Sequence, residues 1–222
     1  MKPGLNWIDT LSPPARRALV DASGVRVMPD GVVLYQQGDV TTEFFQIEAG
    51  EVRQFLLTAD GLEVLLYINR RGDVIADSSA VDREPYPTII ATRGATRLRV
   101  WRVETLDRLR RAYPELDGAL AVQMAKRMRA FLVLIEELCT LPMPARVAGR
   151  LLAFADMRGA ADLDISQADL ALMAGVARAS VNEILAELRA RRLVETEYAR
   201  IRILDSEGLR LYRDASRRRP AR

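Results

Sequence analysis

Residues 167–184, QADLALMAGVARASVNEI, carry the pattern that most limits what this chain can fold into. Ala171 supplies the small side chain that two closely crossing helices need at their contact, and Gly175 can adopt the positive φ of a tight turn. Five apolar residues have the spacing to line the core between the two helices: Leu170, Val176, Val181, Ile184 and Leu185. This combination of spacings is typical of a helix-turn-helix.

The start of the motif carries a helix-capping signal. Ser166 is followed three residues later by Asp169, much as in a capping box. A tight two-helix corner leaves the outer face of its second helix free, and that face fits the major groove of DNA. The pattern therefore predicts DNA binding, although an ordinary pair of helices in a helical domain would show similar spacing.

The absence of histidine from the 222 residues narrows the chemistry open to this chain. No histidine can bind a metal ion or the iron of a haem, and no histidine-based catalytic triad can form. An enzyme of the cupin type usually needs a histidine-rich metal site, so we expect neither an enzyme nor a bound metal or cofactor. The sequence does not formally exclude a metal site built from carboxylates or a flavin-binding site. The single cysteine, Cys139, allows no disulfide within the chain and fits a reducing compartment.

Targeting signals are lacking, and positive charge is concentrated in one half. No apolar run approaches the ~18 residues of a membrane span, and the N-terminus has no signal-peptide core, so we expect a cytoplasmic protein without membrane contact. Residues 142–222 carry 15 basic and 11 acidic residues, whereas residues 1–141 carry 18 and 19. The excess beside the helix-turn-helix is the expected electrostatic footprint for phosphate contacts, although a solvated arginine-rich surface would give the same excess.

Before the helix-turn-helix, the residue pattern changes from one typical of strands to one typical of helices. A short helical segment is expected over residues 5–20. From Val25 to Val103, β-rich runs alternate with glycines roughly every ten residues, which indicates a β-sandwich or roll. Residues 106–111 predict one or two helical turns, and residues 114–141 a long helix. Its apolar residues alternate at spacings of three and four, typical of a two-helix seam: Ala121, Met124, Met128, Phe131, Ile135 and Leu138.

The last part of the chain is predicted as a second domain. Pro142 and Pro144 end the long helix, and a new helix follows over residues 145–157. A loop is expected over residues 158–164, and alternation over residues 194–204 predicts the hairpin wing of a winged helix. The segment SEGLRLY returns to helix, and SRRRPAR is expected to be a disordered basic tail.

This order of parts resembles the CRP/FNR family of bacterial transcription regulators. The resemblance covers essentially the whole chain and rests on Gly38-Asp39, Gly50, Gly72-Asp73, residues 121–129 and residues 165–194. It implies an α+β fold with a jelly-roll-like β-roll, similar to a cyclic-nucleotide-binding domain, over 1–113, a dimerisation helix over 114–141 and a winged helix-turn-helix over 142–222. It also implies a homodimer that places two recognition helices in successive major grooves of a palindromic operator.

The same resemblance implies a recognition helix over about Arg178 to Arg189. Arg178 matches the arginine typical of the family, which could contact guanine in bidentate fashion for ~1–3 kcal/mol of discrimination. Glu183 would accept from a cytosine amino group or remain a solvated helix residue paired with an arginine. Ala179 and Glu183 differ from the best-known member, so its half-site is not expected unchanged. The implied DNA contacts are Ser166, Gln167, Arg178, Ala179, Ser180 (to a phosphate), Asn182 and Glu183.

The effector pocket implied by the family can be checked position by position. Cyclic-nucleotide-binding members carry a Gly-Glu pair and, ten residues after the glutamate, an Arg-Ser pair; here these are Ala76-Asp77 and Pro87-Thr88. The Thr-Ser pair that contacts adenine from the long helix corresponds to Phe131-Leu132. Burying a phosphate monoanion without its arginine costs several kcal/mol. We therefore predict no useful affinity for cyclic AMP.

Several alternatives stay open from the sequence alone. Phe131 and Leu132 could fill the pocket, which would leave a protein that binds DNA without an effector. The pocket could instead accept a different small molecule, apolar or aromatic, or a cyclic nucleotide through a rearranged segment 77–87. The loop 156–164 lies where activators of the family touch RNA polymerase, but a connecting loop is equally expected there.

Overall fold

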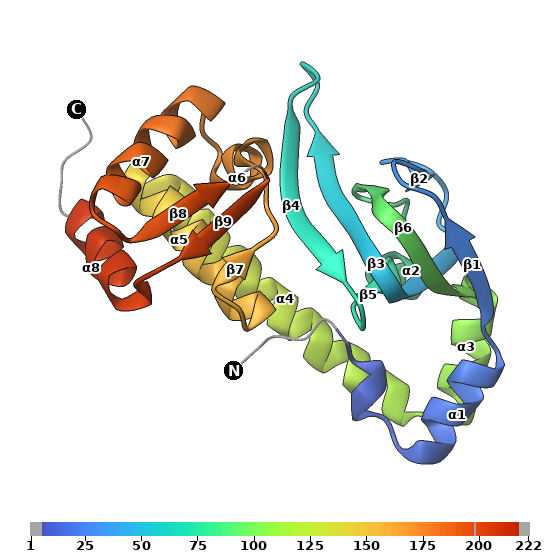
Figure 1. Cartoon of the computed structure of the whole chain (residues 1–222). Coiled ribbons are helices and arrows are strands. Elements are labelled where there is room, and N and C mark those ends of the chain that lie inside the picture. The colour runs from blue at the N-terminus through green and yellow to red at the C-terminus, as the bar shows by residue number, and fades with distance from the viewer. Residues whose placement is uncertain (1–5, 198, 218–222) are drawn as a thin grey trace. The chain divides into compact units, whose positions relative to one another are not determined.

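The computed structural model describes residues 6–197 and 199–217, and its elements have the predicted α+β order (Figure 1). The N-terminal elements are the 3-10 helix η1 (Ile8–Thr10), α1 (Pro13–Asp21), β1 (Gly24–Met28), β2 (Val33–Tyr35), β3 (Glu43–Leu57), β4 (Glu63–Arg70), β5 (Val74–Ile75), α2 (Asp77–Asp82), β6 (Ile89–Arg102) and α3 (Val103–Ala112). The others are α4 (Glu115–Thr140), α5 (Met143–Arg158), β7 (Asp162–Leu163), α6 (Gln167–Ala174), α7 (Arg178–Ala190), β8 (Val194–Glu197), β9 (Arg200–Ile203) and α8 (Ser206–Arg217).

The chain divides into two compact units, one ending at Arg129 and the other beginning at Ala130. The division falls inside α4, whereas the sequence places boundaries at the two ends of this helix. The last turn of α4 contacts the C-terminal elements, since Glu137 pairs with Arg150 and the Leu138 carbonyl accepts from Arg146. Each unit is therefore described by itself.

The β-roll of the first unit is one antiparallel sheet, six-stranded within the described residues. Its main order is β1-β6-β3-β4, while β2 pairs with β6 and β5 with β3. The long strands β3 and β6 are paired along most of their length, from Glu43 opposite Arg102 to Phe55 opposite Ile89. The β-rich, glycine-punctuated region predicted between Val25 and Val103 is confirmed as a β-sheet domain.

Helices close one side of this unit around aromatic side chains. Phe44 of β3 and Trp101 of β6 stack with ring centroids 4.9 Å apart, and Trp101 Nε1 donates to the Leu19 carbonyl of α1 at 2.7 Å. Leu106 of α3 and Leu116 of α4 are fully buried in the same core. A second core inside the roll contains Tyr35, Phe45, Ile47, Val52, Ile75, Tyr86, Ile90, Leu98 and Val100.

Some predicted helical segments need correction. The helix expected over residues 5–20 begins only at Pro13, because Pro13 and Pro14 fit the first turn of a helix but not its interior. The segment expected at residues 106–111 is longer, ten residues, and starts at Val103. The segment 77–87, treated as a loop, begins with the short helix α2.

The second unit surrounds a small sheet with helices. Strands β8 and β9 form the predicted hairpin, and β7 pairs with β9 to give the order β7-β9-β8. The loop prediction for residues 158–164 is therefore wrong at Asp162 and Leu163. Helix α8 packs along α5 (Figure 1) and continues through Ser216, which was predicted to lie in a disordered tail.

The extension of α8 has a clear physical reason. Leu209, Tyr212 and Ser216 are buried at helical spacing, so the buried face of α8 continues almost to the end of the helix. Residues 218–222 of the predicted tail lie outside the described part. Within residues 6–197 and 199–217, no helix combines the length and apolarity needed to cross a membrane.

Gly50 offers a test of the β-roll packing. Its φ is +81°, and a Cβ there would meet the Ala95 carbonyl oxygen at 2.5 Å and Thr96 Cα at 2.8 Å. We expect Gly50→Ala to lower the free energy of unfolding by at least about 2 kcal/mol in urea denaturation, since backbone strain and overlap add. Gly61→Ala is the matched control, because its φ is +82° and its Cβ would meet nothing; only about 1 kcal/mol is expected. Equal losses in the two variants would contradict this packing.

Candidate nucleic-acid interface

The first helix of the motif begins where its cap predicts. Ser166 has an extended backbone and its Oγ accepts a hydrogen bond from the Asp169 backbone N–H at 3.0 Å. This bond satisfies one of the N–H groups left free at a helix start. The capping interaction predicted from the sequence is therefore confirmed.

The turn between the two helices depends on Gly175. Its φ is 61° and its ψ is 45°, the left-handed conformation that glycine adopts without strain. Both the Gly175 and the Val176 backbone N–H groups donate to the Ala171 carbonyl, which ends α6 in the manner of a Schellman motif. The predicted positive φ is confirmed, and it allows the chain to enter α7 after only three residues.

The second helix has one buried and one free face. Leu170 of α6 is fully buried, as are Val181 and Leu185 of α7, while Ile184 is nearly so and Val176 is half-buried. Four residues of the predicted DNA-contact set form the opposite face of α7 and are exposed: Arg178, Ala179, Asn182 and Glu183. Ser180 of α7 is half-buried, as are Ser166 and Gln167 at the start of α6. Arg178, Ala179, Ser180, Asn182 and Glu183 lie in the first two turns of α7, where the helix dipole favours phosphate.

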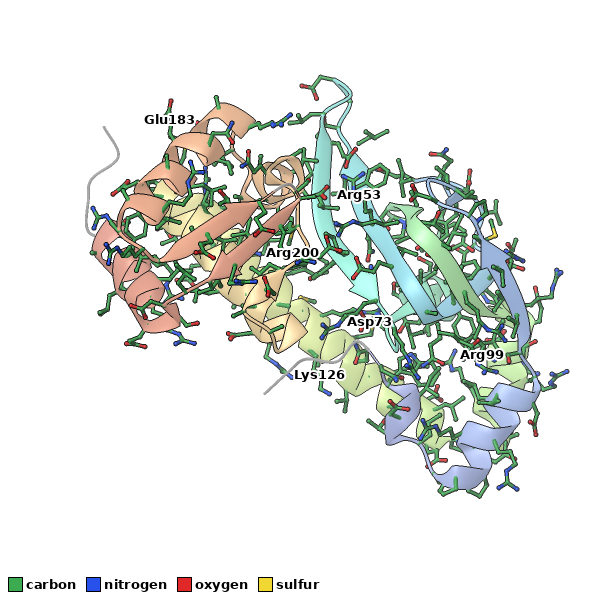
Figure 2. All side chains as sticks on the ribbon, in the orientation of Figure 1. Arg53, Asp73, Arg99, Lys126, Glu183 and Arg200 are labelled. Atoms are coloured by element: carbon green, nitrogen blue, oxygen red, sulfur yellow. The ribbon has the colours of Figure 1, made fainter. Side chains whose placement is uncertain are left out.

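The charged groups on this face are available to a ligand. Among the described residues, neither Arg178 nor Glu183 has a hydrogen-bond or ion-pair partner, so no described arginine pairs with Glu183. Figure 2 labels Glu183 on α7. Arg178 can therefore reach a base or a phosphate without breaking an existing ion pair.

The wing adds residues that the sequence reading did not single out. Arg200 of β9 is exposed and, within the described chain, unpaired (Figure 2), whereas Arg202 pairs with Asp162 at 3.2 Å and with Glu195 at 3.7 Å. Arg189 donates to the Thr196 hydroxyl at 2.9 Å and so joins α7 to β8. The alternation of arginine and isoleucine in RIRI was the available signal, because alternate residues of a strand point to opposite faces.

The back of α7 is held by α8. The Tyr212 hydroxyl donates to Glu187 Oε2 at 3.0 Å, and the Arg191 guanidinium lies 5.2 Å from the Tyr212 ring centroid. Burial, followed by the neighbouring Glu187 carboxylate, raises the pKa of Tyr212 to about 12. The hydroxyl is therefore protonated, and remains a donor, throughout the physiological pH range.

The position of the family's pocket carboxylate is occupied by an internal ion pair. Asp77 is fully buried; its Oδ2 accepts from Trp7 Nε1 at 3.0 Å, and its Oδ1 pairs with the Arg127 guanidinium of α4. Arg127 Nη2 also donates to the Val74 carbonyl at 2.8 Å. Both Asp77 oxygens are thus already hydrogen-bonded within the chain. Trp7 and Arg127 were not predicted, because they lie 70 and 50 positions away in the sequence.

The remaining pocket positions are neutral. Ala76 keeps a positive φ of 63°, Pro87 is exposed, and the buried Thr88 hydroxyl accepts from Gln54 Nε2 at 3.2 Å. Tyr35 stacks on Tyr86 with centroids 3.8 Å apart, and burial raises the pKa of the Tyr35 hydroxyl far above its usual value. The interior near Thr88 is thus lined by aromatic and amide groups.

Phe131 and Leu132, the last two positions of the implied pocket, lie on the long helix α4. They are 37% and 58% exposed in the single chain, and their filling of the pocket remains a prediction. They lie on α4 after Ala130, where the second unit begins. The interior of the roll itself contains the residues of its own core.

The apolar seam of α4 is largely uncovered in the single chain. Ala121 is exposed, Met128 and Ile135 are 62% and 56% exposed, and Leu138 is 39% exposed. Met124 is half-buried against the helical core of the first unit. The described residues contain no group of three histidine, cysteine or carboxylate side chains that could hold a metal ion.

Comparisons with known families match both units. Residues 25–113 match the cyclic nucleotide-binding domain, and residues 145–212 match the Crp-like helix-turn-helix domain. Together the two matches include the β-roll and the complete helix-turn-helix.

Individual relatives agree with this assignment. The chain is 28% identical to the CRP-like cAMP-activated global transcriptional regulator of Mycobacterium tuberculosis, covering 82% of this chain and 84% of that protein. It is 26% identical to the transcriptional activator protein FnrA of Stutzerimonas stutzeri, over 83% and 78% of the two chains. The fold resembles that of the c-di-GMP responsive regulator CLP of Xanthomonas campestris, with a TM-score of 0.77 and 19% identity over 87% and 100% of the two chains.

The Asp77–Arg127 pair offers a second test. Asp77→Asn would leave the Arg127 guanidinium, only 18% exposed, without its counter-charge, and we expect a loss of about 3 kcal/mol of unfolding free energy. Arg102→Gln is the matched control, since Arg102 and Glu104 form an exposed pair with side chains 73% and 70% exposed; a change below about 1 kcal/mol is expected. Urea unfolding measures both. An Asp77→Asn protein as stable as the control would show that the buried pair does not hold α4.

Proposed function

Because the chain belongs to the CRP/FNR family of transcription regulators, we propose that it binds a palindromic DNA operator as a homodimer and does so without cyclic AMP. The observation that carries this proposal is the free face of α7, where Arg178, Asn182 and Glu183 are exposed and the helix start carries no acidic residue. That face has the size and polarity of a major-groove reading surface.

Dimerisation is supported by the uncovered side chains of α4. Met128, Phe131, Ile135 and Leu138 follow the spacing of a two-helix seam and remain at least 37% exposed in the single chain. A contiguous apolar strip of this kind marks an interaction surface, and a second copy of the same helix would cover it symmetrically. Two recognition helices related by this symmetry would meet half-sites about one helical turn apart.

Independence from cyclic AMP is supported by the missing pocket arginine. Pro87 stands at its position, and Arg127, the guanidinium near the pocket carboxylate, already pairs with Asp77. A bound phosphate monoanion would therefore lack a free counter-charge. The relatives differ in effector, since one is named for cAMP and another for c-di-GMP, so membership of the family assigns neither to this chain.

In a second hypothesis, the protein does respond to a small-molecule effector. The buried amide of Asn69 donates to Gln54 Oε1 at 3.1 Å, while its own Oδ1 has no partner within the described residues. Under this hypothesis the effector would be an apolar or aromatic molecule with one hydrogen-bond donor, or a cyclic nucleotide bound in a rearranged pocket. RNA polymerase remains a proposed partner through residues 156–164.

Selection from random-sequence duplexes tests the main proposal. The purified protein, without added nucleotide, is expected to enrich a palindrome whose half-sites are about 10 bp apart, centre to centre. Failure to enrich any palindrome at low salt would remove the proposal. Enrichment only after addition of a cell extract would favour the second hypothesis.

Arg178→Ala tests the assignment of a base-reading residue. We expect this change to abolish preference at one base pair of each half-site, a loss of about 1–3 kcal/mol there, because a bidentate guanine contact disappears. Arg210→Ala on α8 is the control and should leave both affinity and preference unchanged. Competition mobility shifts with every single-base operator variant give the measurement. A uniform loss for all sequences would mean that Arg178 contacts only phosphate.

Ile135→Asp tests the proposed seam. A charge buried in a symmetric helix pair should shift the protein to monomer and weaken operator binding at least about 100-fold, since the two half-sites would no longer be engaged together; Phe131→Asp should act in the same direction. Val122→Asp is the control, because Val122 is 55% exposed on α4 but outside the seam. Sedimentation that finds an unchanged dimer for Ile135→Asp would refute this choice of interface.

A further inference from the structure

The C-terminal end of α4 is joined to the turn of the helix-turn-helix by one side chain. Arg146 of α5 donates from Nη1 to the Leu138 carbonyl of α4 at 3.2 Å, and from Nη2 to the Gly175 carbonyl at 3.4 Å. These three residues all belong to the unit that begins at Ala130. A single guanidinium therefore bridges two helix ends that are 37 positions apart in the sequence.

The sequence explains why the Leu138 carbonyl lacks a backbone donor. In an α-helix it would accept from the backbone N–H four residues later, but that residue is Pro142, which has none. Arg146 supplies the missing donor. The Gly175 carbonyl lies one residue beyond the end of α6, so the cation sits at the negative ends of two helix dipoles.

Arginine suits this position better than lysine. Its planar fork presents separate donors in fixed directions and can serve two acceptors on different elements at once, whereas lysine presents a compact charge on a flexible stem. Arg146 Nε is buried without a hydrogen-bond partner among the described residues. A buried N–H without an acceptor lowers the stability of the fold. We therefore attribute the position of the guanidinium to its two hydrogen bonds with carbonyl groups.

Two further contacts join the same elements. Glu137 of α4 pairs with Arg150 of α5, and the two side chains are 20% and 14% exposed. Leu138 lies against the turn, because a Cβ at Gly175 would be 3.3 Å from Leu138 Cδ2. The end of α4, the start of α5 and the turn before α7 are thus held together by independent polar and apolar contacts.

We propose that Arg146 is a positioning residue that sets the direction in which α7 leaves the dimerisation helix, and thereby the spacing of half-sites that the dimer accepts. The Gly175 carbonyl held by Arg146 lies three residues before the first residue of α7, so its placement governs where α7 starts. This inference rests on the proposed dimeric, operator-binding function.

Half-site spacing is the property that a merely structural role would not change. The operator obtained by selection is prepared with its natural spacing and with one base pair added or removed at the centre. The unaltered protein should lose about tenfold or more in affinity on either altered operator, because both half-sites cannot then be engaged without distortion. Arg146→Gln should reduce this discrimination to about twofold while preserving base preference within each half-site. Arg210→Gln on α8 should behave like the unaltered protein.

Each outcome decides between the explanations. If Arg146→Gln binds every operator more weakly but keeps the full spacing preference, Arg146 only stabilises the domain and the inference is wrong. If Arg146→Gln does not fold, Arg146→Lys replaces it; a reduced spacing preference supports the inference and a full one overturns it. If the unaltered protein prefers no palindrome, the proposed function fails instead, so the two failures can be told apart.

Discussion

The buried carboxylate of Asp77 constrains α4, and the features that α4 carries depend on this constraint. Asp77 is fully buried and joins three distant segments, since it accepts from Trp7 near the N-terminus and pairs with Arg127 of α4. A buried charge without its partner is strongly destabilising, so α4 is fixed in rotation about its own axis at Arg127. That rotation leaves Met128, the next residue, facing solvent.

The consequences follow along the helix toward the DNA-binding unit. Ile135, further along the helix, is exposed in the single chain, and we propose that a second copy covers it. Beyond it, Arg146 replaces the donor that Pro142 lacks and holds the end of α4 to the turn at Gly175. The ion pair to Asp77 is made near the middle of α4, in the first unit, whereas the hydrogen bonds of Arg146 are made at its C-terminal end, in the second unit.

Local physical chemistry explains which parts the sequence could predict. The cap at Ser166 and the positive φ of Gly175 depend on neighbouring residues, so the helix-turn-helix could be placed almost to the residue. The Asp77–Arg127 pair depends on tertiary packing between residues 50 positions apart, and no local pattern signals it. The tail was misjudged at Ser216 because burial against the domain outweighed a basic composition. Phe131 and Leu132 are exposed in the single chain, so whether they fill the pocket depends on contacts that no local pattern determines.

One titration tests most directly whether DNA binding by the proposed dimer needs no cyclic nucleotide. The affinity of the purified protein for its selected palindrome is measured with and without a saturating concentration of cyclic AMP. We expect the same dissociation constant in both, within about twofold. Tightening of about fivefold or more, the coupling typical of an allosteric effector, would contradict it.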